Sequence, residues 1–159
     1  MNIVRFKLID EFIDKAIEQF EAQKNRILAL MPSADVQHIG STAIPGSVTK
    51  GDLDINVRVP KEDFKETVAA LKKLYQINQP KNWKSDFASF KNEPLNLGVQ
   101  VTIIGSQADD FVRLRDILID HPELLKEFNE MKQKFEGKGM DDYRKEKAEF
   151  FEKLRRNNL

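Results

Sequence analysis

Apolar residues recur along the chain with two different periods, and the period separates helices from strands. Between residues 9 and 31, apolar side chains return every three or four positions and charged residues occupy the opposite face. The same helical spacing appears at 61–75, 108–120, 122–135 and 141–156. Apolar and polar residues alternate at 53–59 and 97–104, which is typical of half-buried strands. The pattern therefore predicts five helices and at least two strands.

Prolines and turn residues mark the ends of these segments. Pro32 closes the first helix, Pro60 ends the strand 53–59, and Pro122 suits the first turn of its helix. A short strand at 36–39 leads into a loop, and the segment 76–96 predicts a strand or a hairpin. Short strands mixed with helices, without regular alternation, predict one α+β domain over residues 1–159. We expect a small mixed β-sheet flanked by helices.

Composition narrows the possible functions. The chain has 26 Lys and Arg against 26 Asp and Glu, so no overall basic field attracts a long nucleic acid. It has no cysteine, which excludes disulfides, zinc–thiolate sites and cysteine nucleophiles. No apolar run reaches the length of a signal peptide or a membrane span. We therefore expect a cytoplasmic protein that does not associate with membranes.

One stretch of the sequence suggests chemistry. Gly40 and Ser41 predict a tight turn with free backbone N–H groups, which suits a phosphate. Asp52 and Asp54 are two positions apart on a predicted strand, so their carboxylates point to the same face. Neighbouring carboxylates repel each other and favour a bound cation, and hard oxygen ligands select Mg²⁺ or Mn²⁺. An isolated Asp-x-Asp pair can also simply lie on the solvent-exposed face of a strand, without binding a ligand.

The wider pattern resembles a known family. The stretch 36–46 reads Val-Gln-His-Ile-Gly-Ser-Thr-Ala-Ile-Pro-Gly, and Lys50 and Asp-Leu-Asp-Ile at 52–55 follow it. The stretch 114–123 and the spacing of Tyr143, Lys147 and Phe150 continue the match. Together they resemble the GrpB (UPF0157) family of the nucleotidyltransferase, or DNA polymerase β-like, superfamily. The resemblance covers most of the chain and implies a nucleotidyltransferase-like fold.

The resemblance also implies a site. Asp52 and Asp54 would be its catalytic carboxylates and would hold Mg²⁺ or Mn²⁺. The backbone of Gly40 and the hydroxyl of Ser41 would meet the phosphates of a nucleoside triphosphate. The nucleotidyl group would pass to a small molecule or another acceptor. The identity of the nucleotide, the acceptor and the oligomeric state stay open at this point.

Four further residues are candidates for binding the substrate. Lys50 could neutralise a phosphate or pair with a carboxylate. Arg115 could add positive charge or form a surface ion pair with Asp116. Tyr143 and Lys147 share one helix face, where the tyrosine could stack on a base and the lysine could contact a phosphate. Alternatively, these two residues only form the edge of an amphipathic helix and contact no ligand.

The sequence departs from the superfamily pattern at one position. Superfamily members usually add a third carboxylate from a neighbouring strand, and this strand carries Gln100 there. Glutamine is neutral and cannot take a proton, although Glu93, Asp86 or Asp109 could substitute. The alternative hypothesis is therefore a catalytically degenerate protein that serves as a binding or regulatory module.

Histidines and phenylalanines receive simpler interpretations. His38 precedes the Gly-Ser turn, and we interpret it as a strand-end histidine whose ring bonds the backbone. Phenylalanines such as Phe111 and Phe128 are interpreted as core residues and not as a stacking platform.

Overall fold

A mixed sheet of five strands organises the molecule, whose computed structural model describes residues 3–157. In spatial order the strands are β2 (Asp35–Ile39), β4 (Leu53–Val59), β7 (Leu97–Ile103), β6 (Phe87–Asn92) and β5 (Gln76–Ile77). The central pair β4 and β7 is parallel, and the other neighbours are antiparallel. The predicted α+β class with a small mixed sheet is therefore confirmed.

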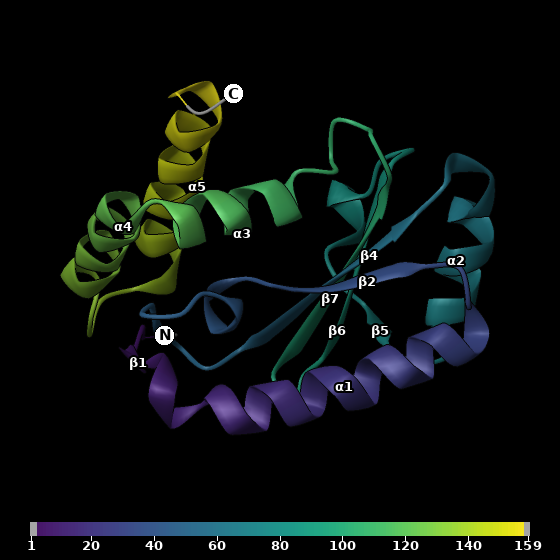
Figure 1. The fold of residues 1–159 in the computed structure, drawn as a ribbon, viewed down its shortest axis with the longest axis horizontal. Coiled ribbons are helices and arrows are strands. Elements are labelled where there is room, and N and C mark those ends of the chain that lie inside the picture. Colours follow the sequence, from purple (N-terminus) through teal and green to yellow (C-terminus); the bar gives the residue numbers. More distant parts are fainter. Residues whose placement is uncertain (1–2, 158–159) are drawn as a thin grey trace.

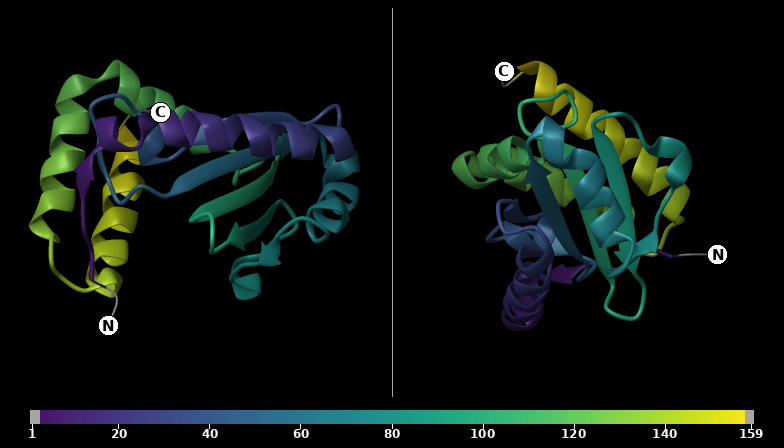
Figure 2. Two further views of the ribbon diagram at one scale, coloured as in Figure 1. Left: turned by 90° about the horizontal axis from the view of Figure 1, so that it is seen from below. Right: turned by 90° about the vertical axis from the view of Figure 1, so that its right-hand side faces the viewer.

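Five helices flank this sheet in two groups. The helices α1 (Ile13–Leu30) and α2 (Phe64–Leu71) lie against one face of the sheet. The helices α3 (Phe111–Asp120), α4 (Pro122–Lys134) and α5 (Met140–Asn157) gather at one end of the molecule (Figure 1). The views in Figure 2 show α1 running along the sheet, away from the α4–α5 pair. No helix among residues 3–157 is long and apolar enough to cross a membrane.

Strand alternation separates an apolar core from a polar face. Odd-numbered residues of β4 and β7, such as Ile55, Val57 and Val99, are buried against α1 and α2. Even-numbered residues of the same strands, Asp54 and Gln100 among them, point to the opposite face. A second core fills the helical group and includes Ile44, which follows the Gly-Ser turn. The turn that carries the candidate site is thus anchored between the two cores.

Most predicted elements are present, and the differences occur at their ends. The predicted helix 61–75 becomes the 3₁₀ turn Lys61–Asp63 followed by α2, which ends at Leu71. Helix α3 begins at Phe111, later than predicted, because the Asp109 carboxylate accepts the Gly105 N–H and holds the preceding segment as a turn. The structure adds a two-stranded sheet that the sequence did not predict, formed by β1 (Lys7–Leu8) and β3 (Val48–Thr49).

Candidate functional site

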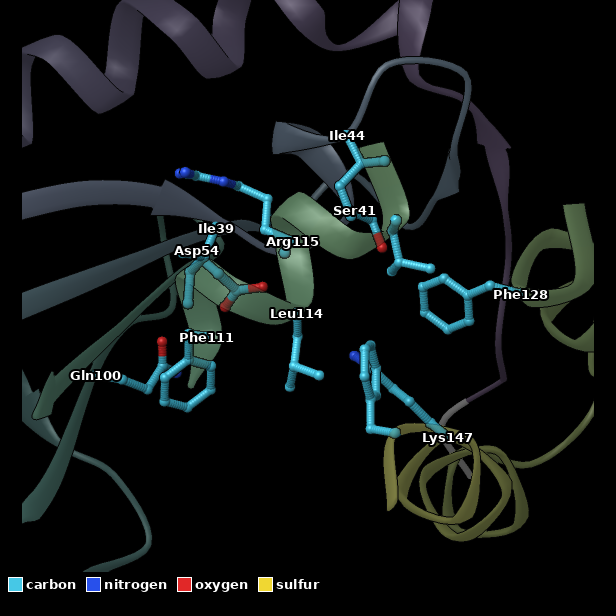
Figure 3. Close-up of a pocket in the computed structure, with 13 residues that line it drawn as sticks. Ile39, Ser41, Ile44, Asp54, Gln100, Phe111, Leu114, Arg115, Phe128 and Lys147 are labelled. Atoms are coloured by element: carbon cyan, nitrogen blue, oxygen red, sulfur yellow. The ribbon is translucent and has the colours of Figure 1, made fainter. Parts of the chain in front are cut away.

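A pocket of about 240 Å³ lies between the polar face of the sheet and the helical group. Its polar side chains are Ser41, Asp54, Gln100, Arg115 and Lys147, and its remaining wall is largely apolar. Figure 3 shows the hydroxyl of Ser41 and the amino group of Lys147 directed into the space that the Asp54 carboxylate also faces. The fold therefore brings the predicted turn, one of the two aspartates and one predicted lysine to a single cavity.

Two glycines make room for the Asp54 carboxylate. Gly40 has a positive φ of 74°, and a Cβ atom there would lie 2.7 Å from Oδ2 of Asp54. A Cβ atom on Gly98 would lie 2.8 Å from Oδ1 of the same carboxylate. A side chain at either position would displace the carboxylate. Position 98 requires a glycine because of strand pairing, since Gly98 lies opposite Asp54 in the β4–β7 register.

The Asp54 carboxylate is desolvated and lies near a second carboxylate and two lysines. Burial raises its pKa to about 6, and the nearby Asp52 carboxylate contributes to that rise. The positive charges of Lys147 and Lys50 act in the opposite direction. A cation between the two carboxylates would favour their ionised forms.

Lys132 is a component of the site that the sequence reasoning missed. It is 0% exposed, and its ammonium donates to Ser41 Oγ over 3.0 Å and to the Val48 carbonyl over 2.5 Å. The same ammonium lies 4.0 Å from the centre of the Phe128 ring. Burial lowers its pKa to about 7, with a further contribution from the positive charge of Lys147. The sequence did contain a signal for this burial, because Lys132 occupies the apolar stripe of α4 between Phe128 and Phe135.

A hydrogen-bonded chain links His38 to the backbone of Asp52. The Thr42 hydroxyl lies 2.9 Å from His38 Nε2 and donates to the Asp52 carbonyl over 3.2 Å. Because the Thr42 hydroxyl donates its proton to the Asp52 carbonyl, Nε2–H of His38 donates to the Thr42 oxygen. Burial, followed by the charge of Arg115, lowers the pKa of His38 to about 4. His38 is therefore neutral and bonds a side-chain hydroxyl, and not the backbone group we expected.

Lys50, Lys147 and Tyr143 form one group beside the two aspartates. Lys50 lies 3.7 Å from Oδ2 of Asp52, which is the carboxylate pairing considered from the sequence. The ammonium groups of Lys50 and Lys147 lie 5.7 and 5.9 Å from the centre of the Tyr143 ring. Tyr143 is only 2% exposed and packs edge-on against Phe6. The tyrosine ring thus lies near two positive charges and does not line the pocket.

Arg115 contacts the edge of the sheet. Its Nη1 donates to the His38 carbonyl over 2.9 Å and to Gln37 Oε1 over 3.1 Å. Its Nε pairs with Asp116 over 3.0 Å, as the surface ion-pair alternative expects. Figure 3 shows its guanidinium directed away from the cavity, so the pocket meets mainly the stem of the side chain.

The acids considered as substitutes for the third carboxylate are engaged elsewhere. Asp109 binds Arg58 through both oxygens, Asp86 accepts the Ala108 N–H, and Glu93 pairs with Lys91 on the surface. Within residues 3–157, no cluster of three or more acidic, histidine or cysteine side chains could hold a metal. Gln100 itself lines the pocket.

Aromatic residues contribute more to the site than the sequence suggested. Phe111, Phe128 and Phe151 line the pocket, although Phe111 and Phe128 were interpreted as core residues only. Phe128 serves both purposes, since it is 1% exposed and also borders the cavity. The helical group therefore supplies an apolar and aromatic wall opposite the carboxylates.

Comparison with solved structures supports the fold. GrpB from Enterococcus faecalis matches with a TM-score of 0.66 at 18% identity, over 81% of each chain. The RNA terminal uridylyl transferase Cid1 matches with a TM-score of 0.55 at 12% identity, over 79% of this chain but 40% of Cid1. A structure of Cid1 poly(U) polymerase with MgGTP bound matches with a TM-score of 0.51 at 10% identity, over 76% of this chain and 41% of that one. These likenesses show a nucleotidyltransferase-like fold.

Sequence comparison establishes the family. A UPF0157 protein of Vibrio cholerae is 31% identical over 153 residues, which span 95% of this chain and 81% of that protein. The family model described as GrpB protein matches residues 10–157. The resemblance deduced from the motifs is thereby confirmed, and the chain belongs to the GrpB family.

Proposed function

We propose that the protein binds a nucleoside triphosphate together with Mg²⁺ or Mn²⁺ and transfers its nucleotidyl group to a small acceptor. The observation that carries this proposal is the position of the Asp54 carboxylate. It lies between two glycines and faces the same pocket as the Ser41 hydroxyl. The nucleotidyltransferase-like fold, which Cid1 with bound MgGTP shares, supports the proposal.

The donor set fits a metal ion that arrives with phosphate. Asp52 and Asp54 supply hard carboxylate oxygens, and Mg²⁺ typically uses one or two carboxylates and completes its shell with phosphates and water. Because no third acid stands nearby in the described part of the chain, a bare ion would find few protein ligands. The two aspartates would hold the ion, and the bound ion would neutralise and orient the phosphates.

Three lysines and one turn favour binding of the phosphates. The Ser41 hydroxyl faces the pocket, and the buried Lys132 ammonium holds it from behind. Lys147 directs its amino group into the cavity, and Lys50 stands beside Asp52. The pocket volume of about 240 Å³ is smaller than most nucleotide-sized sites. We therefore expect the triphosphate to extend past the turn towards solvent, with the pocket taking only part of the ligand.

Thermal stabilisation tests the nucleotide site directly. The unfolding midpoint is measured with each nucleoside triphosphate, with and without Mg²⁺ or Mn²⁺. A ligand present at about 100 times its Kd adds about 2.7 kcal/mol to the free energy of unfolding. We expect a metal-dependent shift that disappears in the double variant Asp52→Asn, Asp54→Asn and persists in Asp120→Asn, which changes an exposed aspartate. The absence of a shift with every nucleotide would reject the proposal.

A second candidate is a binding or regulatory module that does not transfer the nucleotide. The presence of Gln100 in the pocket favours it, because this side chain cannot take a proton. Release of pyrophosphate in the presence of acceptors separates the two candidates. A module binds the metal–nucleotide complex without releasing pyrophosphate, whereas a transferase releases it in proportion to the labelled acceptor.

A further inference from the structure

The pocket offers almost nothing that could remove a proton from an attacking group. Its acidic and basic side chains are Asp54, Arg115 and Lys147, and Asp54 is the one carboxylate among them. In the proposed function Asp54 holds the metal ion, which leaves it unavailable as a base. A hydroxyl acceptor needs such a base, because a neutral hydroxyl attacks phosphorus poorly.

Asp52, outside the pocket, pairs with Lys50 and holds the metal ion in the proposed function, and four other titratable groups outside the pocket have partners of their own. The Lys132 amino group is directed to Ser41 and Val48, and the His38 ring to Thr42. Asp86 and Asp109 are bound to the segment that precedes α3. None of these four titratable groups lines the pocket.

Gln100 can assist an attacking group without accepting its proton. Its side chain lines the pocket, its Oε1 atom is buried, and no hydrogen bond within residues 3–157 fixes the amide. The amide is therefore able to turn its two N–H groups towards the cavity. An N–H group stabilises an oxygen that carries negative charge, and such a charge-assisted bond is stronger than a neutral one.

The rest of the pocket suits an anion with an apolar body. Lys147 directs its ammonium into the cavity and forms no ion pair among the described residues. Phe111, Leu114 and Phe151 line the same cavity and supply an apolar wall. A carboxylate or phosphate attached to a small apolar group matches both features.

We propose that the acceptor attacks through an oxygen that is already ionised, in a carboxylate or a phosphate monoester, with Gln100 and Lys147 receiving its charge. The inference rests on the proposed nucleotidyl transfer. The ionised oxygen forms a bond to the α-phosphorus, the bond between that phosphorus and the bridging oxygen breaks, and pyrophosphate leaves with the electron pair. No proton moves in this step. The product is a mixed anhydride from a carboxylate or a phosphoanhydride from a phosphate.

Matched aromatic probes test the charge of the acceptor. Benzoate, phenyl phosphate and benzyl alcohol are supplied with the α-labelled nucleotide that gives the largest thermal shift. Hydroxylamine converts the benzoyl product to benzohydroxamate and the labelled nucleoside monophosphate, so labelling of benzoate is counted as benzohydroxamate. We expect an ionised probe to be labelled about 100-fold faster than benzyl alcohol, because the alcohol lacks a base. The ionised probe that is labelled distinguishes a carboxylate acceptor from a phosphate acceptor.

Variants of Gln100 assign the preference to this side chain. Gln100→Glu places a negative charge beside the acceptor, so labelling of the ionised probes is expected to fall about tenfold while benzyl alcohol improves. Gln100→Met removes the N–H donor without adding charge, and should slow only the ionised probes. Gln133→Glu makes the same change at an exposed position of α4 and should leave the ratio unchanged. Binding of 4-fluorobenzoate and 4-fluorobenzyl alcohol, followed by ¹⁹F NMR with a non-hydrolysable nucleotide, should show the same order.

The outcomes separate this inference from the proposed function. Faster labelling of benzyl alcohol, or a probe ratio that neither Gln100 variant changes, would overturn the inference. Failure to label any probe while the metal-dependent thermal shift is present would also overturn it, and would leave nucleotide binding standing. Absence of the thermal shift itself would instead count against the proposed function.

Discussion

The ammonium of Lys132 donates a hydrogen bond to the hydroxyl of Ser41 across 3.0 Å, from a position with no exposure to solvent. The two residues are 91 positions apart, so the bond joins the Gly-Ser turn of the sheet to helix α4 of the helical group. Lys132 also bonds the Val48 carbonyl. A single side chain on α4 therefore fixes both sides of the loop that carries the candidate phosphate site.

Replacement of Lys132 by methionine tests this anchor. Lys132→Met keeps the apolar stem but leaves Ser41 and the Val48 carbonyl without their donor, at a cost of about 1–3 kcal/mol for unsatisfied buried groups. Removal of a desolvated ammonium offsets part of that cost. We expect a small change in the free energy of unfolding, measured by denaturant titration, and loss of most of the nucleotide-dependent thermal shift. Lys134→Met, at an exposed position of the same helix, should keep the shift. An undiminished shift in Lys132→Met would rule out a role for the anchor in binding.

Stability should depend on pH with opposite signs in two ranges. The pKa of Lys132 is lowered from 10.5 to about 7, so the unfolded chain binds more protons between these values. The contribution of Lys132 therefore makes stability rise with pH from about 7 to about 10.5. The pKa of Asp54 is raised from 3.8 to about 6, so the folded protein binds the extra proton and stability falls as pH rises through that range.

Denaturant titrations over a pH series measure both slopes. Asp54→Asn should remove the falling component at acidic pH, and Lys132→Met should remove the rising component at alkaline pH. Metal-dependent binding of the nucleotide should strengthen as pH rises through about 6, because Asp54 must be ionised to hold a cation. Slopes that both variants leave unchanged would show that other groups dominate the titration.

The hydroxyl of Thr42 should support the position of Asp52. Thr42→Val keeps the size of a fully buried side chain but removes the bonds to His38 and to the Asp52 carbonyl. We expect a loss of about 1–3 kcal/mol in unfolding free energy and a weaker Mg²⁺-dependent shift. Thr67→Val is a matched control, because Thr67 is also fully buried and bonds the Asp63 carbonyl far from the pocket. Equal loss of the Mg²⁺-dependent shift in both variants would show a general effect of destabilisation.

Sequence periodicity predicted the elements that depend on local pattern and missed features that depend on contacts between them. The alternation at 53–59 and 97–104 located β4 and β7 to within one residue, because one face of each strand packs on a helical layer. The pairing of β1 with β3 was not predictable, since each strand has two residues and no alternation can be read. The need for glycine at position 98 was not predictable either, because it arises only when β7 pairs with β4 and brings Gly98 beside the Asp54 carboxylate.

The candidate site was predictable to a similar extent. The Gly-Ser turn and the two aspartates are close in sequence, so their spacing alone indicated a common site. Lys132 lies on a distant helix and reads as one of many surface lysines unless its place in the apolar stripe is noticed. The direction of Arg115 towards the sheet edge depends on how α3 crosses β2, which the sequence pattern does not contain.

The close approach of Gly40 to Asp54 gives a prediction with a matched control elsewhere in the chain. Gly40 and Gly105 both have positive φ values, 74° and 82°, so alanine strains the backbone at each position. A Cβ atom on Gly40 meets the Asp54 carboxylate at 2.7 Å, whereas one on Gly105 meets nothing within 4 Å. We expect Gly105→Ala to lose about 1–3 kcal/mol of unfolding free energy and Gly40→Ala to lose more, because the ψ of −174° at Gly40 belongs to a region that essentially only glycine adopts. Only Gly40→Ala should also lose the metal-dependent nucleotide shift, because its new methyl group displaces the carboxylate. If both variants kept the full shift in a thermal titration with Mg²⁺ and nucleotide, the Asp54 carboxylate would not be the metal ligand.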